Sequence, residues 1–78
     1  MEFTVVQCRA GRALLGWTMG ELASAAGIGV MTVNRFEGGQ TVAAASITKI
    51  AKTLSDAGVI LIGDGEASAS GRAGVRLA

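Results

Sequence analysis

The chain has 78 residues, the length of one small domain. Half of its residues are apolar, but fourteen are alanine and only 4% are aromatic, so an unaided core contributes about 3–5 kcal/mol. The single cysteine excludes a disulfide framework and a cysteine-rich zinc module, and it suits a reducing compartment. Histidine and tyrosine are absent, which removes the commonest general base and the usual metal ligand. We therefore expect no catalytic residue, no metal site and no cofactor, and we expect association of two copies to add stability.

Neither a membrane span nor an export signal is expected. No apolar run approaches the roughly 18–20 residues needed to cross a bilayer. The first residues, Met1 to Thr4, carry an acid where a signal peptide has basic residues. These features predict a cytoplasmic protein. The net charge of +1 means that any contact with a polyanion depends on clustered cations and not on bulk charge.

Two helices are predicted in the first third of the chain. The first runs from Val5 to Leu15, because Thr4 followed three residues later by Gln7 has the form of a capping box. The second runs from Met19 to Ala26, with Thr18 as its N-cap and an acid in its first turn. Small and apolar residues on one side of each helix indicate the face that turns towards a core.

Two further helices are predicted in the middle of the chain. The third runs from Val30 to Gly38 and directs Val33 and Phe36 inward at the spacing i, i+3. The fourth runs from Ala44 to Ala57 and is the clearest amphipathic helix, because apolar residues recur at i, i+3, i+4 and i+7. These residues are Ile47, Ile50, Ala51 and Leu54. Gly58 is the stop signal of the fourth helix.

The pattern becomes extended after the fourth helix. Val59 to Ile62 is a β-branched and apolar run, and Val75 to Leu77 is a second short apolar segment. A short C-terminal β-strand or hairpin is therefore expected. Between the two segments, a stretch rich in glycine, serine and alanine contains Asp64 and Glu66. Without further acids, this stretch predicts a solvated loop and no calcium site.

The first of these predicted strands indicates that the chain forms a homodimer. Its four apolar residues need cover on both faces and on both edges. They are Val59, Ile60, Leu61 and Ile62. The fourth helix and the second strand cover part of them, which leaves one edge bare in a monomer. We therefore divide the chain into residues 1–58, a helical domain, and residues 59–78, a β element for dimerisation that acts together with part of the fourth helix.

The second and third predicted helices are joined by a short turn that contains glycine, which is the helix-turn-helix arrangement. Ala23 is small, which lets the third helix cross it closely, and Gly27 suits the backbone conformation of the turn. Ile28 and Val33 are predicted to pack in the angle between the two helices. This part of the sequence resembles the lambda-repressor/Cro type of helix-turn-helix, also called the xenobiotic-response-element family. The matching segments are Gly16-Trp17-Thr18, Glu21-Leu22-Ala23, Ala26-Gly27, Thr32-Val33 and Arg35-Phe36-Glu37-Gly38. The resemblance covers about residues 5–59 and implies a compact, mainly α, four-helix fold.

The same resemblance implies a function. Members of this family bind double-stranded operator DNA as homodimers and regulate transcription in bacteria or phages, usually as repressors. The recognition helix would be Val30 to Phe36. The resemblance places Val30, Met31 and Arg35 at the DNA bases, with Thr32 and Asn34 beside them. It places Thr18, Met19 and the segment after Gly38, which includes Gly39 and Gln40, at phosphates. The resemblance also pairs Arg12 with Glu37 in a partly buried salt bridge between the first and third helices.

The implied DNA-binding surface departs from the family pattern because it has few hydrogen-bond donors. Met19 stands where relatives commonly have glutamine, Val30 and Met31 stand where they have polar or basic residues, and Gly39 stands where arginine or lysine is frequent. An apolar side chain can touch a thymine methyl but cannot make the bidentate hydrogen bonds that identify guanine or adenine. Two interpretations stay open: an operator read through the few polar residues and apolar contacts, or a scaffold that binds another protein, as an antiactivator or antitoxin subunit.

Several residues also have a structural interpretation. Arg35 is either a DNA contact or a solvated helix residue, and Lys49 and Lys52 have the pattern of solubilising charges. Cys8 is predicted to be a small core residue. Trp17 is predicted to fill the space between the first and second helices.

Overall fold

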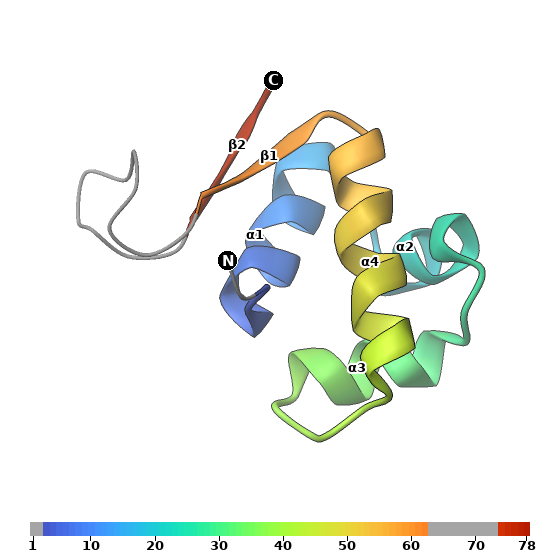
Figure 1. Cartoon of the computed structure of the whole chain (residues 1–78). Helices are drawn as coiled ribbons and strands as arrows, with labels where there is room; N and C mark the ends of the chain where they lie inside the picture. Colours follow the sequence, from blue (N-terminus) through green and yellow to red (C-terminus); the bar gives the residue numbers. More distant parts are fainter. Residues whose placement is uncertain (1–2, 63–73) are drawn as a thin grey trace.

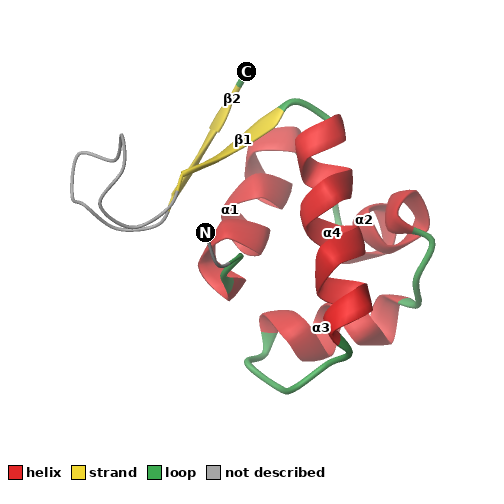
Figure 2. Ribbon diagram, in the orientation of Figure 1, coloured by secondary structure: helices red, strands yellow, loops and turns green. Residues whose placement is uncertain are grey.

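The computed structural model describes residues 3–62 and 74–78. Its elements are, in chain order, α1 (Val5–Leu15), α2 (Met19–Ala26), α3 (Val30–Glu37), α4 (Ala44–Asp56), β1 (Val59–Ile62) and β2 (Gly74–Leu77). The helices form one body, and the two strands lie beside α1 (Figure 1, Figure 2). The predicted fold class, a mainly helical domain with a short C-terminal hairpin, is confirmed. Asp64, Glu66 and the loop expected around them lie outside the described residues.

The bounds predicted from the sequence differ little from the observed ones. Helices α3 and α4 each end one residue earlier than predicted, and β2 begins at Gly74 and not at Val75. Differences of this size are usual at the ends of elements, where terminal turns change geometry gradually.

The first two helices begin at complete capping boxes, as the sequence predicts. In α1, the Thr4 hydroxyl accepts a hydrogen bond from the Gln7 N–H at 3.1 Å, and Gln7 Oε1 accepts one from the Thr4 N–H at 3.0 Å. In α2, Thr18 and Glu21 exchange the equivalent bonds at 3.1 and 2.9 Å. Each box satisfies two backbone amides that have no partner within the helix, and so fixes the residue at which the helix begins. Helices α3 and α4 have no side-chain cap.

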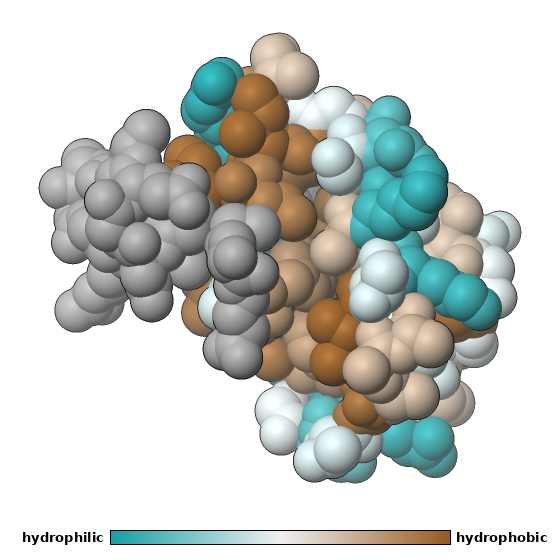
Figure 3. Space-filling view, viewed as in Figure 1, coloured by the Kyte–Doolittle hydropathy of each residue, from teal (hydrophilic) through white to brown (hydrophobic). Residues whose placement is uncertain are grey.

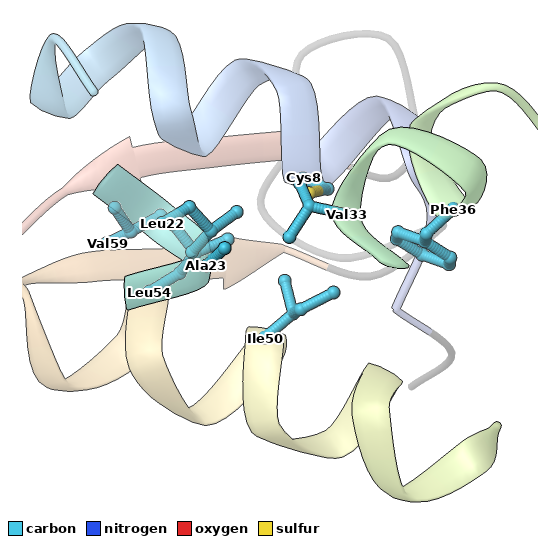
Figure 4. Close-up of a cluster of buried hydrophobic side chains, with 8 residues drawn as sticks. All are labelled: Cys8, Leu22, Ala23, Val33, Phe36, Ile50, Leu54 and Val59. Carbon is cyan, nitrogen blue, oxygen red and sulfur yellow. The ribbon is translucent and has the colours of Figure 1, made fainter. Parts of the chain in front are cut away.

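The hydrophobic core of the described residues is one cluster to which all four helices and β1 contribute. Its members are Cys8, Leu22, Ala23, Val33, Phe36, Ile50, Leu54 and Val59 (Figure 4). Cys8 is fully buried, as predicted, and Trp17 is half-buried against the cluster. Helices α1 and α4 approach closely at Gly11, where a Cβ would lie 3.1 Å from Leu54 Cδ1. The small size of Gly11 thus allows α1 to pack on α4.

The hairpin is antiparallel, in a register that pairs Ile62 with Gly74. Its side chains alternate between two faces, so Val59 enters the core at 2% exposure while Ile60 is 36% exposed on the other face. Gln7 of α1 is buried, and its Nε2 donates to the carbonyl oxygens of Ile62 at 2.9 Å and Gly74 at 3.1 Å. These two bonds join α1 to both strands at the end of β1 and the start of β2.

Candidate nucleic-acid interface

Helices α2 and α3 form a fixed two-helix unit. Helix α2 ends at Gly27, whose backbone is left-handed (φ 71°) and whose N–H donates to the carbonyls of Ala23 and Ser24. The N–H of Ile28 then donates to the carbonyl of Ala23 at 3.0 Å, and α3 begins two residues later. This conformation costs a residue with a Cβ about 1–2 kcal/mol, so glycine suits the turn. Ala23 and Val33 both lie in the core cluster, which sets the angle between the two helices.

One side of α3 faces solvent and carries four of the residues predicted at base edges. Because an α-helix turns by about 100° per residue, Val30, Met31, Asn34 and Arg35 share this side, opposite the two buried residues of the helix. Val30 is 47% exposed and Met31 is 55% exposed, and Asn34 and Arg35 are exposed as well. Thr32 is half-buried at the edge of this side. We call Val30, Met31, Asn34 and Arg35 the outer face of α3.

The described part of the chain holds few cations that are free to meet a polyanion. Those without an ion pair in residues 3–62 and 74–78 are Arg9, Arg35, Lys49 and Arg76. Arg35 is the one cation on α2 or α3, both of which are described in full. Lys52 is paired with Asp56 at 2.8 Å on the exposed side of α4. The outer face of α3 therefore combines a single charged donor with an apolar first turn.

The C-terminal end of α3 is held to α1 by an ion pair. Arg12 Nε lies 2.7 Å from Glu37 Oε2, and Arg12 Nη2 lies 2.8 Å from Glu37 Oε1, so the pair is bidentate. The remaining nitrogen, Nη1, donates to the carbonyl of Trp17 at 2.9 Å. The arginine side chain is 21% exposed and the glutamate side chain 7%. Charge and geometry together fix the orientation of α3 relative to α1 and to the start of α2.

A thiol adds to this ion pair. Cys8 Sγ donates to Glu37 Oε2 at 3.4 Å, and burial, together with the nearby carboxylate, raises the pKa of the thiol to about 12. Burial also acts to raise the pKa of Glu37, but hydrogen bonds from Arg12 and Cys8 and the attraction of Arg12 and Arg9 outweigh it and lower the pKa below its usual value. Cys8 is thus a neutral hydrogen-bond donor. Its bond to Glu37 is not among the sequence predictions, although Cys8 and Arg12 stand four residues apart on one helix face.

The positions implied at phosphates differ in what they can offer. Thr18 is exposed, and because its oxygen acts as an acceptor in the capping box, its hydroxyl proton is available to a phosphate. Met19 is half-buried against the core cluster and has no donor in its side chain. The N–H groups of Gly39 and Gln40 donate to carbonyls of α3 at 3.0 and 2.9 Å. Gly39 therefore has neither a free amide nor a side chain for a phosphate, whereas the carboxamide of exposed Gln40 keeps its donors.

The four residues predicted at a dimer interface have different environments. Val59 is buried in the core of the single chain, Ile60 is the most exposed, and Leu61 and Ile62 are half-buried. Beside β1 lies an apolar groove of about 470 Å³, lined by Phe3, Ile47, Thr48, Ala51, Lys52, Ser55 and Leu61. Hydrophobic residues gather on the face of the molecule between the hairpin and α4 (Figure 3). The structure thus brings Leu61 and part of α4 together at one apolar surface.

Helices α2 and α3 are held at a fixed angle and joined by a glycine turn, and α3 is exposed along one side. This arrangement defines a helix-turn-helix DNA-binding domain. A family model described as Helix-turn-helix, of the Cro/C1 type, matches residues 9–55, which is more than half of the chain. The chain belongs to this family, as the sequence resemblance implies, and the family is one of DNA-binding transcription regulators and not of enzymes. The curated proteins contain no significant match to the chain. None of the helices in the described residues has the length and apolar character of a membrane span.

Proposed function

We propose that the chain is a sequence-specific transcriptional repressor that binds a palindromic operator as a homodimer in the cytoplasm. The main support for this proposal is the outer face of α3, whose four residues are exposed while Leu22, Ala23, Val33 and Phe36 hold the helix-turn-helix unit in the core. The second helix of such a unit lies in the major groove with its N-terminal residues at base edges.

The polar residues of the outer face have the chemistry of direct base recognition. Arginine can donate to both O6 and N7 of guanine, and asparagine can pair with N6 and N7 of adenine. Arg35 and Asn34 would make these contacts one turn into α3. Thr18 and Gln40, one at each end of the helix-turn-helix unit, would donate to phosphates and hold the register of the protein on the duplex.

Titration of a labelled fragment of the chain's own promoter, at several salt concentrations, tests DNA binding. We expect binding by micromolar protein at low salt, with a slope of log affinity against log salt of about −0.9 per phosphate neutralised. Arg35→Ala should weaken binding by about tenfold or more, because a bidentate base contact is lost. Lys49→Ala is the matched control, since it also removes one exposed cation without an ion pair but lies outside both the outer face of α3 and the groove, and it should change affinity by less than about twofold. Absence of binding at low salt would contradict the proposal.

The homodimer is supported by the exposed apolar surface of the hairpin and by the modest core of a chain of this length. A two-fold axis would place two copies of α3 about 34–36 Å apart, which is one turn of DNA and matches a palindromic site. Light scattering should therefore give twice the mass of one chain. Ile60→Glu should give a monomer that binds DNA weakly, whereas Met31→Glu, at a more exposed apolar residue outside the hairpin, should leave the mass unchanged. A monomeric wild-type chain would contradict this part of the proposal.

A specific observation also favours a second candidate, a protein-interaction module of the antiactivator or antitoxin kind. Val30 and Met31 expose apolar surface on the outer face of α3, and such surface also suits a protein partner. Arg35→Ala separates the two candidates. Loss of DNA binding by this variant, with association to a partner unchanged, assigns the outer face of α3 to DNA.

A further inference from the structure

The outer face of α3 is divided along the helix axis into an apolar turn and a polar turn. Val30 and Met31 are the first two residues of the helix, and they are 47% and 55% exposed. Asn34 and Arg35 follow four residues later on the same side and are also exposed. The apolar pair is therefore the part of α3 nearest to its N-terminal end, which is the end that contacts base edges in this arrangement.

We propose, on the basis of the DNA-binding function above, that Val30 and Met31 select thymine in each half-site through the 5-methyl groups of two neighbouring bases. Thymine presents an apolar 5-methyl group in the major groove beside its O4 acceptor, whereas the edges of guanine, adenine and cytosine there offer hydrogen-bonding groups without a methyl. Valine and methionine can cover a methyl group, but against guanine O6 or cytosine N4 they would displace water without replacing its hydrogen bonds. The first turn thus favours thymine and disfavours a G·C pair.

The geometry of α3 also sets the distance between the two kinds of base. One helical turn rises about 5.4 Å, and successive base pairs are about 3.4 Å apart along each strand. With α3 lying along the groove, the bases met by Asn34 and Arg35 would be about one to two base pairs from the thymines met by Val30 and Met31. The half-site combines adjacent thymines with a guanine or adenine at that separation.

Replacement of thymine by deoxyuridine tests the proposal, because it removes the methyl and keeps the base-pairing edge. The probe is the tightest-binding duplex selected from a randomised library, labelled for fluorescence anisotropy, with every thymine of one half-site replaced. Burial of one methyl corresponds to about fourfold in affinity, so two methyls should give a loss of about tenfold or more. Deoxyuridine placed outside the half-sites is the control duplex and should change nothing.

Protein variants assign the effect to residues. The double variant Val30→Ala/Met31→Ala should bind the thymine duplex weakly and no longer distinguish it from the deoxyuridine duplex. Its fold is checked by circular dichroism, and both residues are exposed, so the core is not altered. Arg35→Ala should weaken binding to both duplexes and keep the ratio between them.

The outcomes separate this inference from the function on which it depends. Equal affinity of the wild-type chain for the two duplexes, with Arg35→Ala still defective, overturns the inference and leaves DNA recognition standing. Selection of half-sites without adjacent thymines overturns it as well. Unchanged DNA affinity in Val30→Ala/Met31→Ala overturns the thymine inference in favour of a protein partner for this surface. Failure to select any duplex at low salt overturns both the thymine inference and the proposed DNA-binding function.

Discussion

Removal of the Arg12 guanidinium should be among the most damaging single changes in this chain. Arg12→Met keeps an unbranched side chain of similar length but leaves Glu37, 7% exposed, without its bidentate partner. It also removes the donor to the carbonyl of Trp17. Loss of one partner from a buried ion pair typically costs about 3–5 kcal/mol, which is the whole stability that a core of this size supplies. The variant should be largely unfolded at 25 °C.

Circular dichroism and the fluorescence of Trp17, recorded without urea, report how much of the Arg12→Met variant is folded, and urea unfolding followed by the same signals gives the stability of wild type and of the variants that remain folded. Arg12→Lys should be intermediate, since it keeps the charge but not the planar fork. The double variant Arg12→Met/Glu37→Leu should recover most of the stability, because a hydrophobic pair leaves no buried charge behind. An Arg12→Met variant within about 0.5 kcal/mol of wild type would refute the argument, and so would a double variant no more stable than Arg12→Met.

The same ion pair predicts a pH dependence. The folded chain holds the pKa of Glu37 below its ordinary value of 4.5. Glu37 therefore contributes stability that is complete above pH 4.5 and is lost as the pH falls through the lower folded value. Urea titrations at decreasing pH should show that Glu37→Gln loses less stability on acidification than wild type. Parallel curves for the two proteins would contradict this assignment.

Three further predictions concern single positions. Gly27→Ala should lower the free energy of unfolding by about 1–2 kcal/mol because φ is 71° there, whereas Gly20→Ala, within α2 and with 3.8 Å between a Cβ and the nearest atom, Thr18 Oγ1, should not lower it; equal effects in urea unfolding would argue against backbone strain. Ala43→Ser should raise the free energy of unfolding by about 0.5–2 kcal/mol by adding the missing side-chain cap of α4, and an unchanged urea midpoint would contradict this. The buried Cys8 thiol, with its pKa of about 12, should not react with Ellman's reagent at pH 8 until urea unfolds the chain, and rapid reaction of the native protein would contradict this account of the thiol.

Local sequence signals predicted the parts of the fold that depend on neighbouring residues. The capping box of Thr4 and Gln7 joins residues three apart, so it is visible in the sequence and is present in the structure. The same holds for the inner side of α3, because the i, i+3 spacing of Val33 and Phe36 defines which side is buried. The exposure of the outer face follows from that periodicity alone.

Contacts between distant residues could not be predicted in this way. The bond from Gln7 to the carbonyl of Ile62 joins residues 55 apart, and that from Cys8 to Glu37 joins residues 29 apart. Their partners are chosen by the packing of whole elements, which no local pattern encodes. The engaged amide of Gly39 is a related case, because it depends on how the last turn of α3 closes.

The buried carboxamide of Gln7 has a consequence for the uniqueness of the strand pairing. A shift of β1 by one residue would turn Val59 out of the core and move the carbonyl of Ile62 away from the amide that binds it. Both apolar burial and a buried polar bond would be lost at once, so competing registers are penalised twice. Since that amide is presented by α1, the native alignment of the hairpin gains this second contribution once the helix has formed, which couples the stability of the hairpin to that of the first helix.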